Sequence, residues 1–134
     1  MNQWIEAFNA HDVAQIVALY TEDAELFDTG MKQPRRGRAE IERWFSTRFR
    51  VMPTIAYTPQ AYLVGEGQAA VSWRASGHTP PLLRQRWLSR PFEVDGISLF
   101  TLRDDLIQQQ HGFYDHLAIA ERVLPPLRWL PLRL

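Results

Sequence analysis

The order of two hydrophobic patterns limits the fold of this chain more than any other feature. Before residue 50, apolar residues recur every three or four positions, which indicates amphipathic helices interrupted by one short strand. After residue 53, long runs rich in β-branched and aromatic residues alternate with turn-forming residues, which indicates successive strands. Helices first and strands afterwards predict an α+β fold in which the helices cover one face of an antiparallel sheet. The predicted helices are residues 4–8, 13–20 and 37–49, and the predicted strands are 24–28, 54–64, 68–78, 92–103 and 106–114.

The composition supplies enough apolar material for one packed domain. The chain has 134 residues, of which 46% are hydrophobic, including five Trp, seven Phe and four Tyr. These residues can form a core and also line an apolar cavity. We expect residues 1–123 to form the domain, with a short helix at 117–120. The Pro-rich apolar tail, residues 124–134, is expected to pack on a groove of its own or of a neighbouring subunit.

Charge and cysteine content narrow the classes of partner. Fifteen basic and fifteen acidic residues give a formal net charge of zero, so the overall field favours neither nucleic acid nor an anionic membrane. Arg35, Arg36 and Arg38 cluster in a Pro/Gly-containing loop, which is typical of a solvated turn. The lack of cysteine excludes disulfides and thiolate metal sites. The first residues do not resemble a secretory signal, and no stretch approaches the ~20 apolar residues of a membrane span, so we expect a cytoplasmic protein.

Seven short segments carry a family resemblance. They are Asn9-Ala-His-Asp12, Ile16-Val-Ala-Leu-Tyr-Thr-Glu-Asp-Ala24, Arg36-Gly-Arg-Ala-Glu-Ile41, Gly77-His-Thr79, Ser89-Arg-Pro-Phe92, Gly96-Ile-Ser-Leu-Phe100 and Gly112-Phe-Tyr-Asp115. The first three look like the opening of nuclear transport factor 2-like proteins, which include the ketosteroid isomerases. The other four resemble the SnoaL-like polyketide cyclase branch. The resemblance implies a cone-shaped, strongly curved antiparallel sheet closed by helices around one pocket, the nuclear transport factor 2-like or cystatin-like α+β barrel.

Asp28 is the first candidate catalytic residue. It ends a short apolar strand, where a carboxylate that faces a pocket loses solvation and becomes a stronger proton acceptor. In the resemblance to the isomerases, this position matches the general base that moves a proton beside a carbonyl. The alternative is an Asp that forms a turn with Thr29 and Gly30.

Asp115 is the second candidate catalytic residue. It follows Gln109, His111 and Phe113 at a spacing of two, so a regular strand would place all four side chains on one face. In the resemblance to the cyclases, Asp115 matches the acid and base of an intramolecular aldol closure. His111 is a third candidate, because an imidazole can exchange a proton near neutrality or hold a carbonyl oxygen. The alternatives are a helix cap for Asp115 and a purely structural role for His111.

The remaining candidates are substrate-binding residues. Trp4 matches the position where the isomerases place a tyrosine that donates to the developing oxyanion, and we expect it to line the pocket or, alternatively, to pack in the core. Ser98 stands where the isomerases keep a second, protonated Asp, which argues against steroid isomerisation. His78 matches a histidine at the pocket rim of the cyclase branch, although a strand end beside a Pro-rich loop also favours exposure. Phe113 and Gln109 complete the predicted substrate-binding set.

These residues favour an enzyme that forms and quenches an enolate in a small apolar carbonyl compound, for example in an aldol cyclisation. Asp115 would be the principal acid/base, with Asp28 and His111 assisting. Such proton transfers need no cofactor or metal. The alternative is a non-catalytic module that binds a small apolar ligand or mainly dimerises. The resemblance implies a homodimer that pairs through the exposed sheet face, where we expect aromatic residues such as Tyr62, Trp73 and Trp87.

Overall fold

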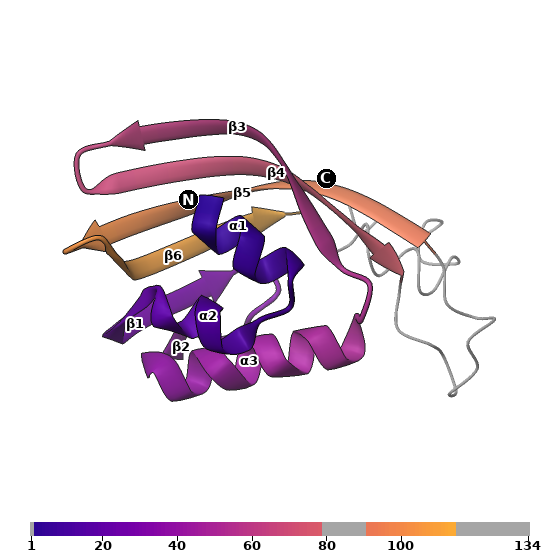
Figure 1. Cartoon of the computed structure of the whole chain (residues 1–134), viewed down its shortest axis with the longest axis horizontal. Helices are drawn as coiled ribbons and strands as arrows, with labels where there is room; N and C mark the ends of the chain where they lie inside the picture. The colour runs from indigo at the N-terminus through magenta and orange to yellow at the C-terminus, as the bar shows by residue number, and fades with distance from the viewer. Residues whose placement is uncertain (1, 79–90, 115–134) are drawn as a thin grey trace.

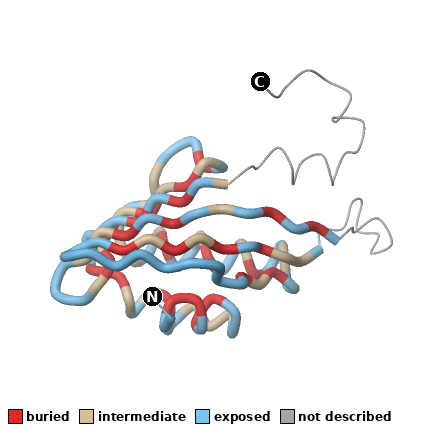
Figure 2. Tube along the Cα trace, turned by 90° about the horizontal axis from the view of Figure 1, so that it is seen from above, coloured by how far each residue is buried: buried red, intermediate tan, exposed pale blue. Residues whose placement is uncertain are grey.

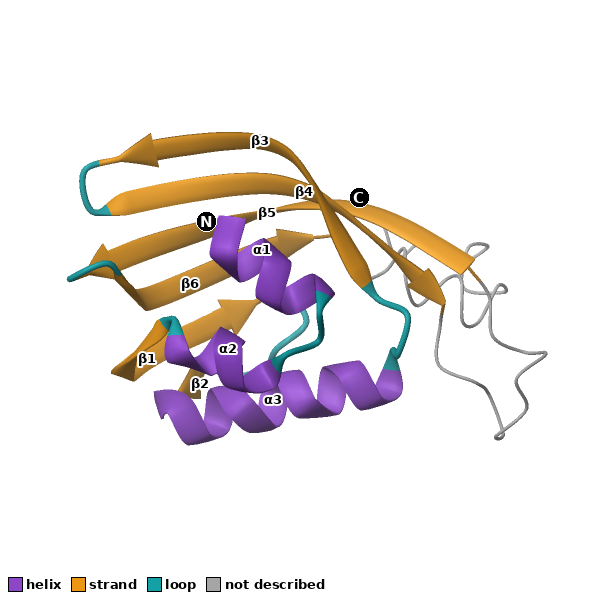
Figure 3. Ribbon diagram, viewed as in Figure 1, coloured by secondary structure: helices purple, strands orange, loops and turns teal. Residues whose placement is uncertain are grey.

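The computed structural model describes residues 2–78 and 91–114, which form three helices on one face of a six-stranded curved sheet (Figures 1 and 3). This is the α+β arrangement that the hydrophobic patterns predict. The strand order in the sheet is β2-β1-β6-β5-β4-β3. The elements are α1 (Asn2–Asn9), α2 (Val13–Ala18), β1 (Tyr20–Asp28), β2 (Arg35–Arg36), α3 (Gly37–Val51), β3 (Ala56–Gly65), β4 (Gln68–His78), β5 (Pro91–Arg103) and β6 (Leu106–Tyr114).

Strands β3 to β6 form an antiparallel meander, but the sheet is not antiparallel throughout. The last strand, β6, lies parallel to the first, β1, with Leu26 opposite Gln110 and Asp28 opposite Gly112. The short strand β2 completes the β1 edge in the antiparallel sense. Residues far apart in the sequence therefore meet at the middle of the sheet, which is where the candidate site lies.

The boundary between α2 and β1 differs from the predicted one. Tyr20 fits the helical spacing of Ile16 and Val17, yet α2 ends at Ala18 and Tyr20 begins β1. The backbone N–H of Ile107 donates to the carbonyl oxygen of Leu19 at 2.7 Å and draws this segment into the sheet. Tertiary pairing thus overrides local helical periodicity.

The break between α1 and α2 fixes the start of β3. The Asn9 side chain exchanges two hydrogen bonds with the backbone of Tyr57, at 2.7 and 2.9 Å. The His11 ring lies 2.7 Å from the carbonyl oxygen of Ile55 and stacks on Phe49 at 4.2 Å between centroids. Asp12 caps α2 by accepting from the backbone N–H of Gln15 at 3.1 Å. We refer to Asn9 and His11 as the β3 clamp.

The two faces of the sheet differ in burial, as the alternating colours along the strands in Figure 2 show. The inner face packs against the helices through an aromatic stack, in which Phe8 and Tyr57 lie 4.0 Å apart and Tyr57 and Trp73 lie 4.5 Å apart. The outer face carries no helix from the described part of the chain. The expectation that Trp73 is exposed is wrong: it is 3% exposed, because its position on β4 points inward.

Gly96 on β5 makes room for Trp73. The two residues are opposite one another in the β4–β5 pairing. A Cβ added at Gly96 would lie 2.4 Å from the Trp73 ring and 2.6 Å from the carbonyl oxygen of Phe113. The indole therefore lies across the bare backbone of β5 and reaches Ser98.

Several predictions fall outside the described residues. These are Trp87, the short helix at 117–120 and the tail at 124–134. Within the described residues, no helix is both long enough and apolar enough to span a bilayer. The cytoplasmic location stays a prediction from the sequence.

Candidate functional site

Asp28 ends β1 on the inner face of the sheet and is 8% exposed. The strand register places it opposite Gly112 of β6, and Gly112 in turn lies opposite Ser98 of β5. A Cβ added at Gly112 would lie 3.2 Å from the Cβ of Asp28 and 3.9 Å from the Ser98 hydroxyl oxygen. The missing side chain at Gly112 therefore leaves the space between the carboxylate and the hydroxyl open.

Three donors surround the Asp28 carboxylate. The backbone N–H of Gly30 donates to Oδ1 at 2.9 Å, which is the turn contact expected as an alternative role for this residue. The Tyr114 hydroxyl also faces Oδ1, at 3.5 Å, and Nη2 of Arg48 lies 3.5 Å from Oδ2. Because the Asp28 and Arg48 side chains are only 11% and 15% exposed, their opposite charges offset much of the cost of burial. Asp28 thus closes a turn and also faces the interior.

Arg48 was not among the predicted site residues. It lies on α3, three, four and seven residues after Phe45, Trp44 and Ile41, so it shares their apolar stripe. Its guanidinium lies 5.0 Å from the centroid of the Trp44 ring. An arginine in the middle of an apolar helical stripe was the sequence signal for this residue.

Two tyrosines complete the polar end of the site. Burial raises the pKa of Tyr57 to about 12; the nearby Arg48 acts in the opposite direction, and Asp28 reinforces the rise. Burial also raises the pKa of Tyr114, against the lowering effect of Arg48. Both hydroxyls are protonated at neutral pH and can donate hydrogen bonds. A Cβ at Gly30 would lie 2.6 Å from the Tyr114 hydroxyl, so this tyrosine also depends on a glycine for its position.

The site consists of two adjoining hollows that share four lining residues. The smaller, about 20 Å³, lies beside Asp28 and has roughly the space that one water molecule needs. The larger is a cavity of about 280 Å³, which we call the apolar cavity. The shared residues are Arg48, Tyr57, Trp73 and Tyr114. The apolar walls of the larger cavity are Met52, Ile55, Ala75, Phe92 and Val94.

Trp4 lines the smaller hollow, as predicted, but its N–H is already engaged. The indole donates to the Tyr20 hydroxyl at 2.9 Å, and Tyr20 donates to the side-chain oxygen of Gln110. Burial raises the pKa of Tyr20 far above its ordinary range, although the hydrogen bond from Trp4 acts in the other direction. With its oxygen occupied, Gln110 presents its amide N–H groups as the remaining donors. Gln110 was also missed, because the sequence pattern drew attention to the opposite face of β6.

Ser98 lies where the sequence predicts it, on the inner face and 2% exposed. Its hydroxyl oxygen accepts from the Trp73 indole at 2.9 Å, so the hydroxyl proton is left to donate.

Within the described residues, no three His, Asp or Glu side chains gather as metal ligands would.

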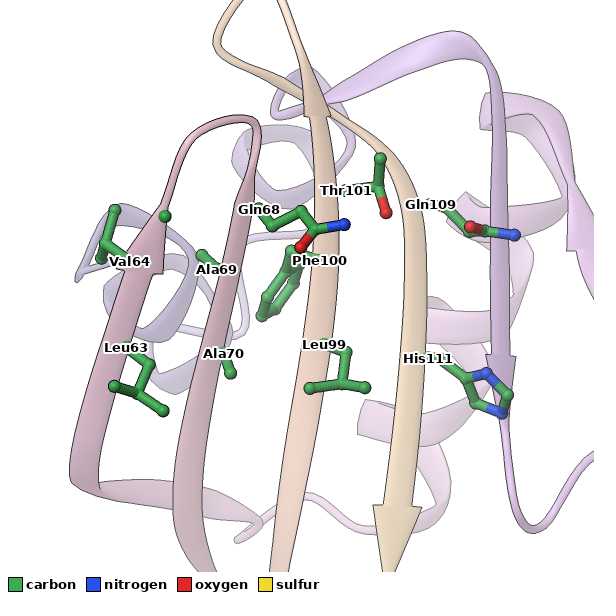
Figure 4. A pocket seen from close by; sticks show the side chains of 11 residues that line it. Leu63, Val64, Gln68, Ala69, Ala70, Leu99, Phe100, Thr101, Gln109 and His111 are labelled. Atoms are coloured by element: carbon green, nitrogen blue, oxygen red, sulfur yellow. The ribbon is translucent and has the colours of Figure 1, made fainter.

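The prediction that Gln109, His111 and Phe113 share a face is confirmed, but this face is not the one that carries Asp28. All three are exposed, and His111 stacks on Phe113 at 4.4 Å between centroids. Gln109 and His111 line a shallow hollow of about 530 Å³ on the outer face of the sheet (Figure 4). The expectation that these three residues act beside Asp28 is therefore wrong for the described geometry. On the inner face, β6 instead contributes Gln110, Gly112 and Tyr114.

The structure does not bring His78 to Asp28. His78 is exposed at the end of β4, where its backbone N–H donates to the Thr54 hydroxyl at 3.0 Å. Asp115 lies outside the described residues. Among the residues predicted from the sequence, the structure thus joins Asp28, Trp4 and Ser98 in one site.

Comparisons with known proteins agree with this architecture. The sequence profile of the SnoaL-like domain matches residues 1–110. A protein of ketosteroid isomerase-like fold from Catenulispora acidiphila, solved in complex with trimethylamine, superposes with a TM-score of 0.82 at 17% identity and covers 97% of this chain and 95% of its own. A protein assigned as a SnoaL-like polyketide cyclase from Shewanella denitrificans gives a TM-score of 0.79 at 10% identity, with 92% and 93% covered. TerC co-crystallised with polyporic acid gives 0.76 at 16% identity, with 91% and 93% covered. A search of curated proteins finds no match.

Proposed function

The chain belongs to the SnoaL-like domain family, and on that premise we propose that it is a cofactor-independent acid/base enzyme acting on a small apolar carbonyl compound. The observation that carries this proposal is the placement of Asp28. Among the residues that the structure describes, it is the one acidic residue whose side chain is buried, and it lies beside the apolar cavity. A buried carboxylate next to hydrogen-bond donors is the arrangement that enolisation requires.

The reaction proceeds by proton transfer through Asp28. The carboxylate takes a proton from the carbon beside the substrate carbonyl, and negative charge develops on the carbonyl oxygen. The Tyr114 hydroxyl, which lies beside Asp28, donates to that oxygen, and the nearby positive charge of Arg48 stabilises it. In an aldol closure, the enolate carbon then attacks a second carbonyl of the same molecule. The protonated Asp28 returns its proton to the new alkoxide, so no proton is gained or lost overall.

Asp115 remains the second acid/base in this proposal, on the strength of the resemblance to the cyclases. His111 is not included, since it lies on the outer face of the sheet. Steroid isomerisation is not proposed either, because a serine hydroxyl bound to Trp73 stands where the isomerases keep a second acid. Variants of Asp28 and Asp115 can be compared in one assay.

The test uses 2-tetralone, an apolar ketone whose α-hydrogens exchange with D₂O once an enolate forms. Proton NMR should show that the protein accelerates this exchange and that Asp28→Asn lowers the acceleration by about a hundredfold or more. Asp115→Asn should also lower it. Asp95→Asn is the control, since Asp95 pairs with Arg74 on the outer face. Exchange that is unchanged in Asp28→Asn would contradict the assignment.

A non-catalytic ligand-binding module is the second candidate. The apolar cavity favours it as much as it favours an enzyme, and two of the structurally similar proteins were solved with small molecules. In that case the protein should bind 2-tetralone, as measured by quenching of its tryptophan fluorescence, without any acceleration of exchange.

We also propose that the chain forms a homodimer through the outer face of the sheet. Strand register aligns one row of side chains across five strands, and Figure 4 shows four of its members side by side. The row consists of Phe27, His111, Leu99, Ala70 and Leu63. A polar row with Gln109 and Thr101 borders it on one side, and the Arg74–Asp95 ion pair lies on the other. An apolar band with a polar rim is the usual anatomy of an interface between copies.

A further inference from the structure

One end of the apolar cavity gathers hydrogen-bond donors around a buried ion pair. Arg48, Tyr57 and Tyr114 all line this end, and among the described residues Asp28 is the one carboxylate that faces them. A buried charge normally has its hydrogen-bonding capacity filled, so donors gathered at one end of a cavity indicate a polar ligand.

The contact between Arg48 and Asp28 uses only part of the guanidinium. It is a single approach of Nη2 to Oδ2 at 3.5 Å, which is longer than the roughly 2.7–2.9 Å of a full charge-assisted hydrogen bond. A guanidinium carries five N–H groups. Arg48 lines both hollows, so its guanidinium is placed to donate to a ligand bound there.

The Tyr57 hydroxyl is a second donor at the same place. Tyr57 lines both hollows, and it forms no side-chain hydrogen bond with any other described residue. Its raised pKa keeps the hydroxyl protonated at neutral pH. The β3 clamp holds its backbone in place from α1, so the hydroxyl and the guanidinium are presented by two separate and well-packed elements.

The opposite side of the cavity has a different chemistry. Its walls contain an isoleucine, a valine, a methionine, an alanine and a phenylalanine, and the Trp73 ring forms part of the lining. A volume of about 280 Å³ is at the low end of small-molecule pockets. A ligand that fits must be compact and apolar at one end, and it must offer acceptors at the other.

We propose that Arg48 and Tyr57 form a subsite for an anionic oxygen, so that the substrate is a compact apolar carbonyl compound bearing a carboxylate or an ionised enol at one end. This inference extends the proposed function of the same site, and it rests on that function in treating the bound molecule as a substrate. The cationic guanidinium accounts for the preference, because an anion gains both charge attraction and hydrogen bonds here.

The test compares two probes of nearly equal shape, 2-naphthoate and the uncharged 2-naphthamide, by isothermal titration calorimetry. The wild-type protein should bind naphthoate at least about tenfold more tightly, since hydrogen bonds to charged groups contribute about 1.5–3 kcal/mol. In Arg48→Gln this preference should disappear, while the affinity for naphthamide stays within about threefold. Arg74→Gln is the matched control, because Arg74 lies in an exposed ion pair on the outer face. This variant should prefer naphthoate to naphthamide as strongly as the wild type does.

Arg48→Gln leaves the Asp28 carboxylate without its cation and can fail to fold. The double variant Arg48→Gln/Asp28→Asn therefore carries the same test in a site without the ion pair, and it too should show no preference for naphthoate. Four results would each overturn the proposal. The wild type could bind the two probes equally or bind neither, or it could bind trimethylammonium more tightly than naphthoate. The fourth result is a preference for naphthoate that survives in the double variant.

Asp28→Asn separates this inference from the proposed function. Removing the negative charge beside Arg48 should make naphthoate bind severalfold more tightly, whereas exchange of 2-tetralone should slow. If exchange does not slow but the naphthoate preference still depends on Arg48, the proposed function fails and the anion subsite stands. If exchange slows but the protein does not prefer naphthoate to naphthamide, only the proposal of an anion subsite fails.

Discussion

At the scale of single residues, the site owes its shape to three glycines as much as to its polar groups. Gly112 separates Asp28 from Ser98, Gly30 admits the Tyr114 hydroxyl, and Gly96 admits the Trp73 indole. In each case an added Cβ would approach a site residue at 3.2 Å or less. The polar groups can converge because the backbone between them carries no side chains.

The substitution Gly96→Ala tests this role. The added methyl group would meet the Trp73 ring and the backbone of Phe113, so we expect the free energy of unfolding to fall by about 1–3 kcal/mol through overpacking. Urea denaturation measures the change. Gly65→Ala is the control, because the nearest atom there lies 4.0 Å from the added Cβ. Equal losses in the two variants would refute a specific role for Gly96.

The sequence predicts some of these residues and not others, for physical reasons. Asp28 could be found because it ends an apolar strand. His111 was assigned to the site because alternation shows which residues share a face but not which face is buried. Gln109, His111 and Phe113 looked like a catalytic row, whereas β6 turns Gln110, Gly112 and Tyr114 inward. Helical periodicity places Arg48 in an apolar stripe, but it does not reveal the partner of the guanidinium, Asp28, which lies 20 residues earlier.

At the scale of elements, the β3 clamp couples a helix junction to the wall of the apolar cavity. Asn9 satisfies both the N–H and the carbonyl of Tyr57, and His11 holds the preceding turn. The position of the Tyr57 hydroxyl is therefore set from α1 and not only by the neighbouring strand.

Replacing Asn9 by Ala should destabilise the protein by about 1–3 kcal/mol, because two partly buried backbone groups lose their partner. Hydrogen exchange at the Tyr57 amide should become faster, and binding of 2-naphthoate should weaken. Gln3→Ala, on the exposed side of the same helix, is the control for helix propensity. Unchanged exchange at Tyr57 in Asn9→Ala would show that the clamp does not hold β3.

Most element boundaries follow from local sequence signals. The bounds of β4 and β6 agree with prediction to the residue, since glycine or paired aspartates mark the turns beside them. The parallel pairing of β1 with β6 could not be predicted from local signals, because it joins segments about 80 residues apart.

At the scale of the whole molecule, the proposed dimer makes a prediction of its own. Leu99 lies in the middle of the outer apolar row and is 43% exposed, so Leu99→Glu would place a charge from each copy in the interface. We expect the dissociation constant to rise by about a hundredfold or more, as measured by light scattering on a sizing column. Val51→Glu, an equally exposed apolar position at the end of α3, should leave the dimer intact. A wild-type protein that is monomeric at micromolar concentration would contradict the proposal.

The parallel pairing of β1 with β6 also sets the order in which this protein can fold. Until β6 is made, β1 has only the two residues of β2 as a sheet partner. The β3 clamp can join the helices to the meander earlier, but β1 pairs with β6 through a contact of long sequence separation, which is a slow type of step. Asp28 meets Gly112 in that same contact. During synthesis on the ribosome, Asp28 therefore lacks its neighbours on β6 until that strand has emerged.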